Sequence, residues 1–127
     1  MINELINISG EQLENIVYRL FTGYYEGFTD DSVFLVGKSG DYGVDVIATS
    51  SEEVTYAVQA KAYSGSVGLA AVQQIVAAKA MYHYDQGMVI TNSFLTKNAH
   101  KLAQANHITV IEGPELSKMI LQMNERT

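Results

Sequence analysis

The sequence has no cysteine, no tryptophan and a single proline among its 127 residues. The lack of cysteine excludes disulfide bonds, thiolate zinc sites, iron–sulfur clusters and a cysteine nucleophile. No apolar run approaches the ~18 residues of a membrane-spanning helix, and the N-terminal residues lack the basic-then-apolar order of a signal peptide. We therefore expect a cytoplasmic protein without a membrane partner.

Charge is also scarce, because only 17% of the residues are charged, and 14 acidic residues outnumber 8 Lys and Arg. The resulting net charge of −6 argues against broad electrostatic binding to nucleic acid. The hydrophobic share of 47% is typical of a globular protein with a well-filled core. At this length we expect a single domain over residues 1–127.

Apolar periodicity predicts helices and strands along the whole chain. Residues 10–22 have the spacing of a core-facing helix, with Ser9 as N-cap and Gln12 completing a capping box. A second helix is predicted over 69–84 and ended by Gly87, with its inward positions at Leu69, Val72, Ile75, Val76 and Ala80. Two more helices are predicted at 96–106 and from Gly113, and strands at 33–36, 44–49, 54–62, 88–90 and 108–111.

The order of these elements, αβββαβαβα, predicts an α/β fold with a mixed central sheet. The strands at 44–49 and 54–62 are close enough in sequence to form an antiparallel hairpin. The later strands alternate with helices, which requires parallel pairing there. We expect three layers, with helices on both faces of the sheet.

Polar residues interrupt the apolar pattern in the predicted hairpin. Gln59 and Lys61 share one face of their strand by its period of two, and Asp45 lies opposite Gln59 if the turn centres near Glu52. The three side chains should therefore converge on one patch. This patch is either an exposed sheet face with a solvated Asp–Lys pair, worth little energy, or a functional cluster.

Glu14 is a further polar residue beside an apolar stripe, on the inward edge of the first helix. Taken alone it is an ordinary boundary glutamate. Together with Asp45 it gives two carboxylates facing a lysine and an amide oxygen, and hard oxygen donors of this kind suit Mg²⁺.

These residues resemble the Mrr-like branch of the restriction-endonuclease fold, the PD-(D/E)xK nuclease superfamily, which carries Asp…Gln-x-Lys. Asp45 in SGDYGVDVIA and Gln59 with Lys61 in YAVQAKAY match that motif. The resemblance extends to EQLENIVYRLF, SVGLAAVQQIVAAKAMY, GMVITNSFLTKNAHKLA and ITVIEGPELSKMI, which together with the Asp45–Lys61 block make five blocks in order. It implies a restriction-endonuclease-like α/β/α fold and a metal-dependent nuclease that acts on DNA.

The resemblance also implies roles for single residues. The catalytic set would be Glu14, Asp45, Gln59 and Lys61, with Asp45, the Gln59 side-chain oxygen, the Ala60 carbonyl and Glu14 around Mg²⁺, for which Mn²⁺ would substitute. Lys61 would stabilise a hydroxide or the charge on the pentacovalent phosphate. The residues expected to contact DNA are Tyr63, Ser64, Gln73, Lys97 and Lys101.

Two departures from the family pattern bear on DNA binding. Ala62 stands where an arginine often follows the catalytic lysine, and the stretch 24–38 is longer and more acidic than the usual strand entry. In the closing block, Glu112 stands where an aspartate is commoner. A domain of this size has no room for a recognition module, so we expect a homodimer or a separate recognition subunit. A Holliday-junction-resolvase-like nuclease and a silent binding module of the same fold remain alternatives.

Overall fold

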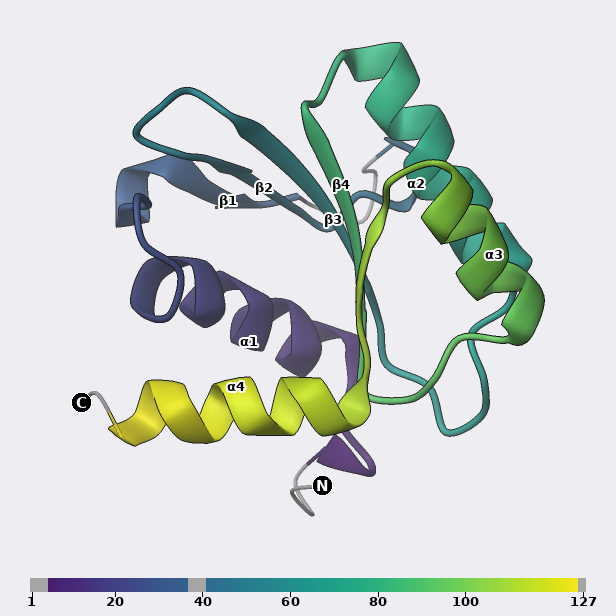
Figure 1. Cartoon of the computed structure of the whole chain (residues 1–127). Helices are drawn as coiled ribbons and strands as arrows, with labels where there is room; N and C mark the ends of the chain where they lie inside the picture. Colours follow the sequence, from purple (N-terminus) through teal and green to yellow (C-terminus); the bar gives the residue numbers. More distant parts are fainter. Residues whose placement is uncertain (1–4, 37–40, 126–127) are drawn as a thin grey trace.

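The computed structural model describes residues 5–36 and 41–125, which fold into a five-stranded sheet between two layers of helices (Figure 1). The strands follow one another across the sheet in chain order, β1-β2-β3-β4-β5. Their bounds are β1 Val33–Leu35, β2 Val46–Thr49, β3 Thr55–Lys61, β4 Gln86–Thr91 and β5 Thr109–Ile111.

The helices cover both faces of this sheet. α1 and α4 pack on one face and α2 and α3 on the other, as Figure 1 shows. Their bounds are α1 Gly10–Gly23, α2 Leu69–Tyr82, α3 Lys97–Ala105 and α4 Gly113–Glu125, with short 3₁₀ turns at η2 Asp30–Ser32 and η3 Asp41–Gly43. The predicted order αβββαβαβα and the three-layer α/β arrangement are confirmed.

Strand directions also agree with the sequence. β2 pairs antiparallel with β1 and β3, whereas β3–β4 and β4–β5 pair in parallel. Val46 pairs with Val58, which sets Asp45, one residue earlier, beside Gln59 as predicted. Since β2 runs against β3, the start of β2 and the end of β3 meet at one edge of the sheet.

The start of α1 is set locally by the sequence. The Ser9 side chain accepts a hydrogen bond from the Gln12 N–H, and the Gln12 side chain accepts one from the Ser9 N–H, so the predicted capping box is present. The helix buries Leu13, Val17 and Leu20 against the sheet. No helix in the described part of the chain is long and apolar enough to cross a membrane.

The second helix differs from the prediction in its rotation and in its end. Its buried positions are Ala71, Val72, Ile75 and Ala78, whereas Leu69 and Ala80, predicted inward, are exposed. The buried face thus combines two alanines with two β-branched residues, and these pack in the core on this side of the sheet.

The helix ends at Tyr82, where His83 caps it in the left-handed conformation with φ of 60°. Gly87, predicted as the stop, lies inside β4 instead. A Cβ there would come within 2.8 Å of the Ile108 side chain, so Gly87 serves close packing between β4 and the segment before β5.

Candidate active site

Asp45 lies just before β2, between β1 and β3. Its backbone N–H donates to the Val58 carbonyl at 2.8 Å and its own carbonyl accepts from the Val36 N–H at 2.8 Å. Its side-chain Oδ2 accepts the N–H of Ala60 at 2.7 Å. The carboxylate is thereby fixed against β3, and the predicted placement of Asp45 opposite Gln59 is confirmed.

Gln59 faces α2 and is fully buried, with 0% of its surface exposed. Its Nε2 donates to Gln74 Oε1 at 2.7 Å, which fixes the orientation of the amide. Its Oε1 is buried and has no hydrogen-bond partner among residues 5–36 and 41–125. Because it is buried, Gln59 is not the exposed sheet-face residue that one interpretation of the sequence expected. A buried polar atom without a partner costs on the order of 1–3 kcal/mol in the free energy of folding.

Gly43 makes room for this amide. It lies in η3 with φ of 69°, a region that favours glycine. A Cβ at this position would collide with the Gln59 amide nitrogen and lie 2.7 Å from Gln74 Oε1. The buried Gln59 side chain therefore depends on the missing side chain at Gly43.

Lys61 ends β3 on the same face as Gln59, and its Nζ lies 5.9 Å from the centroid of the Tyr63 ring. Burial raises the pKa of the Asp45 carboxyl, while the Ala60 N–H and the positive charge of Lys61 act in the opposite direction. Lys61 thus acts on Asp45 through its field, and burial outweighs that field.

The end of β3 is held by a polar turn after β4. Thr91 is fully buried and its Oγ1 donates to the Lys61 carbonyl at 2.6 Å. Asn92 accepts the Tyr63 N–H at 2.9 Å and donates to the Leu5 carbonyl at 2.7 Å. The Lys61 carbonyl and the Tyr63 N–H are therefore fixed by two side chains, one from the last residue of β4 and one from the residue after it.

Glu14 is half-buried on α1, which packs on the face of the sheet opposite the Gln59–Gln74 contact. Its part in the site therefore stays a prediction, as does that of the Ala60 carbonyl. The residues predicted to contact DNA are exposed, and all but Gln73 lie beyond the carboxyl ends of β3 and β4: they are Tyr63, Ser64, Gln73, Lys97 and Lys101.

Sequence reasoning missed Gln74. The family resemblance pointed to Gln73, which lies on the predicted inward face of α2 with Leu69 and Ala80. The actual buried face, with Ala71 and Ala78, is bordered by Gln74 instead. The signal that was available is the spacing of the alanines, since Gln74 lies three residues after Ala71 and four before Ala78.

The oxygen atoms at this site fit a hard divalent cation. The Asp45 carboxylate and the unpartnered Gln59 Oε1 lie on neighbouring strands, and Mg²⁺ prefers carboxylate and carbonyl oxygens. Across residues 5–36 and 41–125, no three His, Cys, Asp or Glu side chains gather as a metal site. A cation held here would consequently depend on the amide oxygen as well as on carboxylates.

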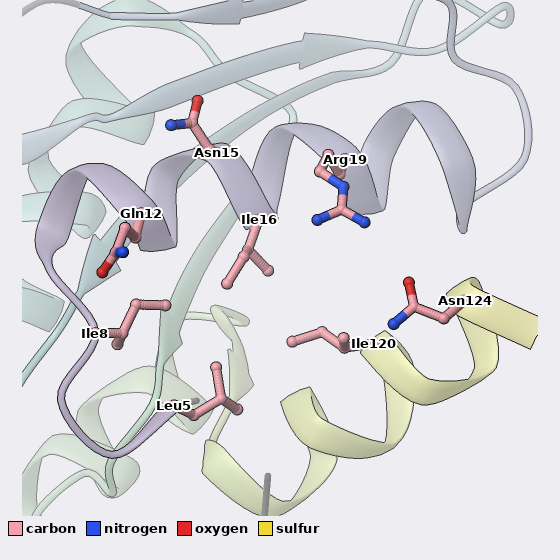
Figure 2. Close-up of a pocket in the computed structure, with 8 residues that line it drawn as sticks. All are labelled: Leu5, Ile8, Gln12, Asn15, Ile16, Arg19, Ile120 and Asn124. Atoms are coloured by element: carbon pink, nitrogen blue, oxygen red, sulfur yellow. The ribbon is translucent and has the colours of Figure 1, made fainter. Parts of the chain in front are cut away.

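A separate hollow lies between α1 and α4, away from these residues (Figure 2). Four apolar side chains line it together with four polar ones, and none is a predicted site residue. These are Leu5, Ile8, Ile16 and Ile120, with Gln12, Asn15, Arg19 and Asn124.

Comparison with known families adds to this geometry. The Mrr catalytic-domain family, described as restriction endonuclease, matches residues 5–120. The chain belongs to this restriction endonuclease family. An E. coli K12 relative, the type IV methyl-directed restriction enzyme EcoKMrr, is 27% identical over 126 residues, or 96% of this chain. The chain spans 41% of the length of that Mrr enzyme.

Solved structures share the fold of this Mrr-family chain. A repair endonuclease from Pyrococcus abyssi aligns with a TM-score of 0.60 and 20% identity, covering 83% of this chain and 46% of its own. The type ISP restriction-modification enzyme LlaBIII, solved bound to DNA, aligns with a TM-score of 0.67 and 23% identity, covering 84% and 8%. These likenesses establish the restriction-endonuclease-like fold.

Proposed function

We propose that this protein is a metal-dependent endonuclease that hydrolyses phosphodiester bonds in DNA. One observation carries the proposal within the nuclease family. The half-buried Asp45 carboxyl has a raised pKa, and the residue opposite it in the hairpin register, Gln59, buries an amide oxygen that has no partner in the described part of the chain. Both oxygens are desolvated without full compensation from the described residues, which is the condition of a site kept ready for a cation.

Asp45 and Gln59 would hold Mg²⁺ or Mn²⁺, with the Ala60 carbonyl and Glu14 as further oxygen donors. When bound, the metal ion lowers the pKa of a water molecule and polarises a phosphoryl oxygen. Gln74 fixes the Gln59 amide by accepting a hydrogen bond from its N–H, which leaves the Gln59 oxygen available as the metal ligand in this proposal.

Lys61 supplies positive charge where negative charge grows on the attacked phosphate. Its backbone is fixed by Thr91 and its ammonium lies over the Tyr63 ring, so the charge is placed before the substrate arrives. Tyr63, Ser64, Gln73, Lys97 and Lys101 would contact the sugar and phosphates of the strand.

A double-strand cut requires two such sites. We propose residues 1–127 as one catalytic domain, in a cytoplasmic protein that acts as a homodimer or with a separate recognition subunit. The net charge of −6 supports this, because it weakens the non-specific attraction of an isolated domain for DNA.

A cleavage assay with Mg²⁺, Mn²⁺ or EDTA on linear, supercoiled and four-way-junction DNA tests the proposal. Asp45→Ala and Lys61→Ala should each lose about 100-fold or more in rate, the scale of removing one preorganised electrostatic group. Lys118→Ala, an exposed lysine on α4, is the matched control and should retain activity.

Equal cleavage by the wild type and both site variants would overturn the catalytic assignment. Selective cutting of the junction would place the protein with resolvase-like nucleases. Metal-dependent binding of DNA without cleavage would show a silent module instead.

A further inference from the structure

Charge is segregated along this acidic chain. Residues 60–111 hold four of the 8 Lys and Arg but one of the 14 acidic residues, Asp85. Asp85 precedes β4, where it binds the Thr55 N–H and hydroxyl at the start of β3. It therefore lies at the end of these strands farthest from Lys61 and Thr91. The carboxyl end of β3 and β4 carries Lys61, Lys97 and Lys101, with Asp45 and Glu112 as its neighbouring acids.

Two loops leave the sheet at this end, and we name them together the two-loop platform, residues 62–68 and 92–96. They lie side by side in Figure 1, below α2 and α3. Hydrogen bonds join them along their length: Tyr63 N–H to Asn92 Oδ1 at 2.9 Å, Ser93 Oγ to the Gly65 carbonyl at 2.7 Å, Val67 N–H to the Phe94 carbonyl at 2.7 Å and Thr96 N–H to the Val67 carbonyl at 2.9 Å.

The platform is anchored on its inner side and presents aromatic rings on its outer side. Val67 and Leu95 are buried and pair as a parallel bridge. Tyr63 and Phe94, by contrast, are 43% and 53% exposed. Because the backbone of both loops is already fixed, these rings lose little conformational freedom when they are covered by a ligand.

Basic side chains occur on the segments that adjoin these rings. Lys61 lies over Tyr63, and Lys97 and Lys101 are exposed on the first turns of α3, directly after the platform. Glu112, the acid that follows β5, is engaged by the Leu95 N–H at 2.7 Å and by His100 at 2.9 Å. An exposed aromatic surface among lysines complements a polyanion that also offers flat apolar faces.

We propose that the two-loop platform binds DNA that contains unpaired nucleotides, with an unpaired base stacked on Phe94 and flanking phosphates held by Lys97 and Lys101. This inference rests on the proposed function and names its substrate class. A paired base in a duplex has both faces covered by its neighbours, so only an unpaired base offers a free face to Phe94.

Fluorescence anisotropy in EDTA, where hydrolysis is blocked, tests the binding directly. The probes are a labelled duplex with a short single-stranded tail and the same duplex fully paired. Phe94→Ala should weaken binding of the tailed duplex roughly 5- to 150-fold, which corresponds to about 1–3 kcal/mol for one stacked base. Phe94→Trp should restore it.

Phe34→Ala is the matched control, because Phe34 is 58% exposed on the edge strand β1. It should leave both affinities unchanged. The double variant Lys97→Ala with Lys101→Ala should weaken binding of both DNAs to the same extent. It should also reduce the salt dependence of binding, by about 0.7–0.9 in the slope of log affinity against log salt concentration for each phosphate that is no longer neutralised.

Equal effects of Phe94→Ala and Phe34→Ala, or an equal loss on paired and tailed DNA, would overturn the inference. So would a Phe94→Ala protein that binds DNA normally but changes its oligomeric state in sedimentation, since the ring would then contact a second copy. Loss of tailed-DNA binding without any cleavage by the wild type would leave this inference standing and remove the proposed function.

Discussion

Two aspartates at opposite ends of the sheet are treated in opposite ways by their surroundings. Asp85, at the start of β4, accepts hydrogen bonds from the Thr55 N–H at 2.8 Å and from the Thr55 hydroxyl at 3.0 Å, and these lower its pKa. Asp45, at the start of β2, accepts the Ala60 N–H at 2.7 Å, yet burial raises its pKa. The fold therefore favours the ionised form of Asp85 and disfavours the ionised form of Asp45.

The difference separates a structural aspartate, Asp85, from the aspartate that we propose to be functional, Asp45. Asp85 ties two strands together and is fully paired with its neighbour, so nothing further is needed to explain it. Burial desolvates the Asp45 carboxyl. The amide oxygen of Gln59, the residue opposite Asp45 in the hairpin, is also buried and has no hydrogen-bond partner among the described residues. The function proposed above assigns these two residues to a cation site, and a cation bound to the folded state would stabilise it.

The largest expected effect is that substitution of one aspartate reduces activity and substitution of the other reduces stability. Asp45→Asn should reduce DNA cleavage by about 100-fold or more while leaving the protein at least as stable, because it removes a desolvated charge. Asp85→Asn should retain cleavage and lower the melting temperature. Parallel cleavage assays and thermal melts decide this, and the same phenotype in both variants would remove the distinction.

Gly43→Ala should be the next largest effect, because it disturbs the Asp45 end through Gln59. The new Cβ collides with the Gln59 amide in a backbone conformation with positive φ. We expect a loss of about 1–3 kcal/mol in the free energy of unfolding by urea, together with reduced cleavage.

Gly65→Ala is the control for this change, since a Cβ at Gly65 meets nothing within 4 Å. It should alter the free energy of unfolding by less than about 0.5 kcal/mol. Equal stability of the two alanine variants would contradict the crowding around Gln59.

A smaller effect is expected at Asn92, which holds the end of β3 as Thr55 and Asp85 hold its start. Asn92→Ala leaves the Leu5 carbonyl and the Tyr63 N–H without their partner. Urea unfolding should show a loss of about 1–3 kcal/mol. Asn98→Ala, on the exposed side of α3, should be nearly neutral, and a similar loss there would show that the Asn92 bonds contribute little.

The smallest effects concern how folding stability changes with pH, and the two aspartates should contribute with opposite signs. The folded state raises the pKa of Asp45, so its ionised form lowers stability, and this cost disappears as the pH falls through that pKa. The folded state lowers the pKa of Asp85, so its ionised form stabilises, and this gain is lost as the pH falls through the lowered pKa.

Melting curves between about pH 7 and pH 3 measure both differences. Asp45→Asn should be more stable than the wild type at neutral pH, and Asp85→Asn less stable. Both differences should shrink towards zero in acid. A stability difference that grows in acid for either variant would contradict the direction of the pKa shift at that aspartate.

Local signals determined much of this protein. The capping box at Ser9 and Gln12 involves neighbours in sequence, so the start of α1 was readable without the fold. The hairpin register was equally local, because a short turn and the alternation of Gln59 with Val58 and Ala60 leave one pairing that buries the apolar face. The Asp45–Gln59–Lys61 neighbourhood followed from that register.

Only the tertiary structure decided how α2 lies on the sheet. Hydrophobicity favoured a face with Leu69, whereas the fold buries the alanine face and thereby brings Gln74, and not Gln73, to Gln59. It also decided that Gln59 is buried with no partner for its oxygen among the described residues, that Gly43 leaves room for the Gln59 amide, and that Asn92 holds the Tyr63 N–H. These facts depend on contacts between segments distant in sequence, whose distances and solvent exposure are fixed only when the helices pack on the sheet.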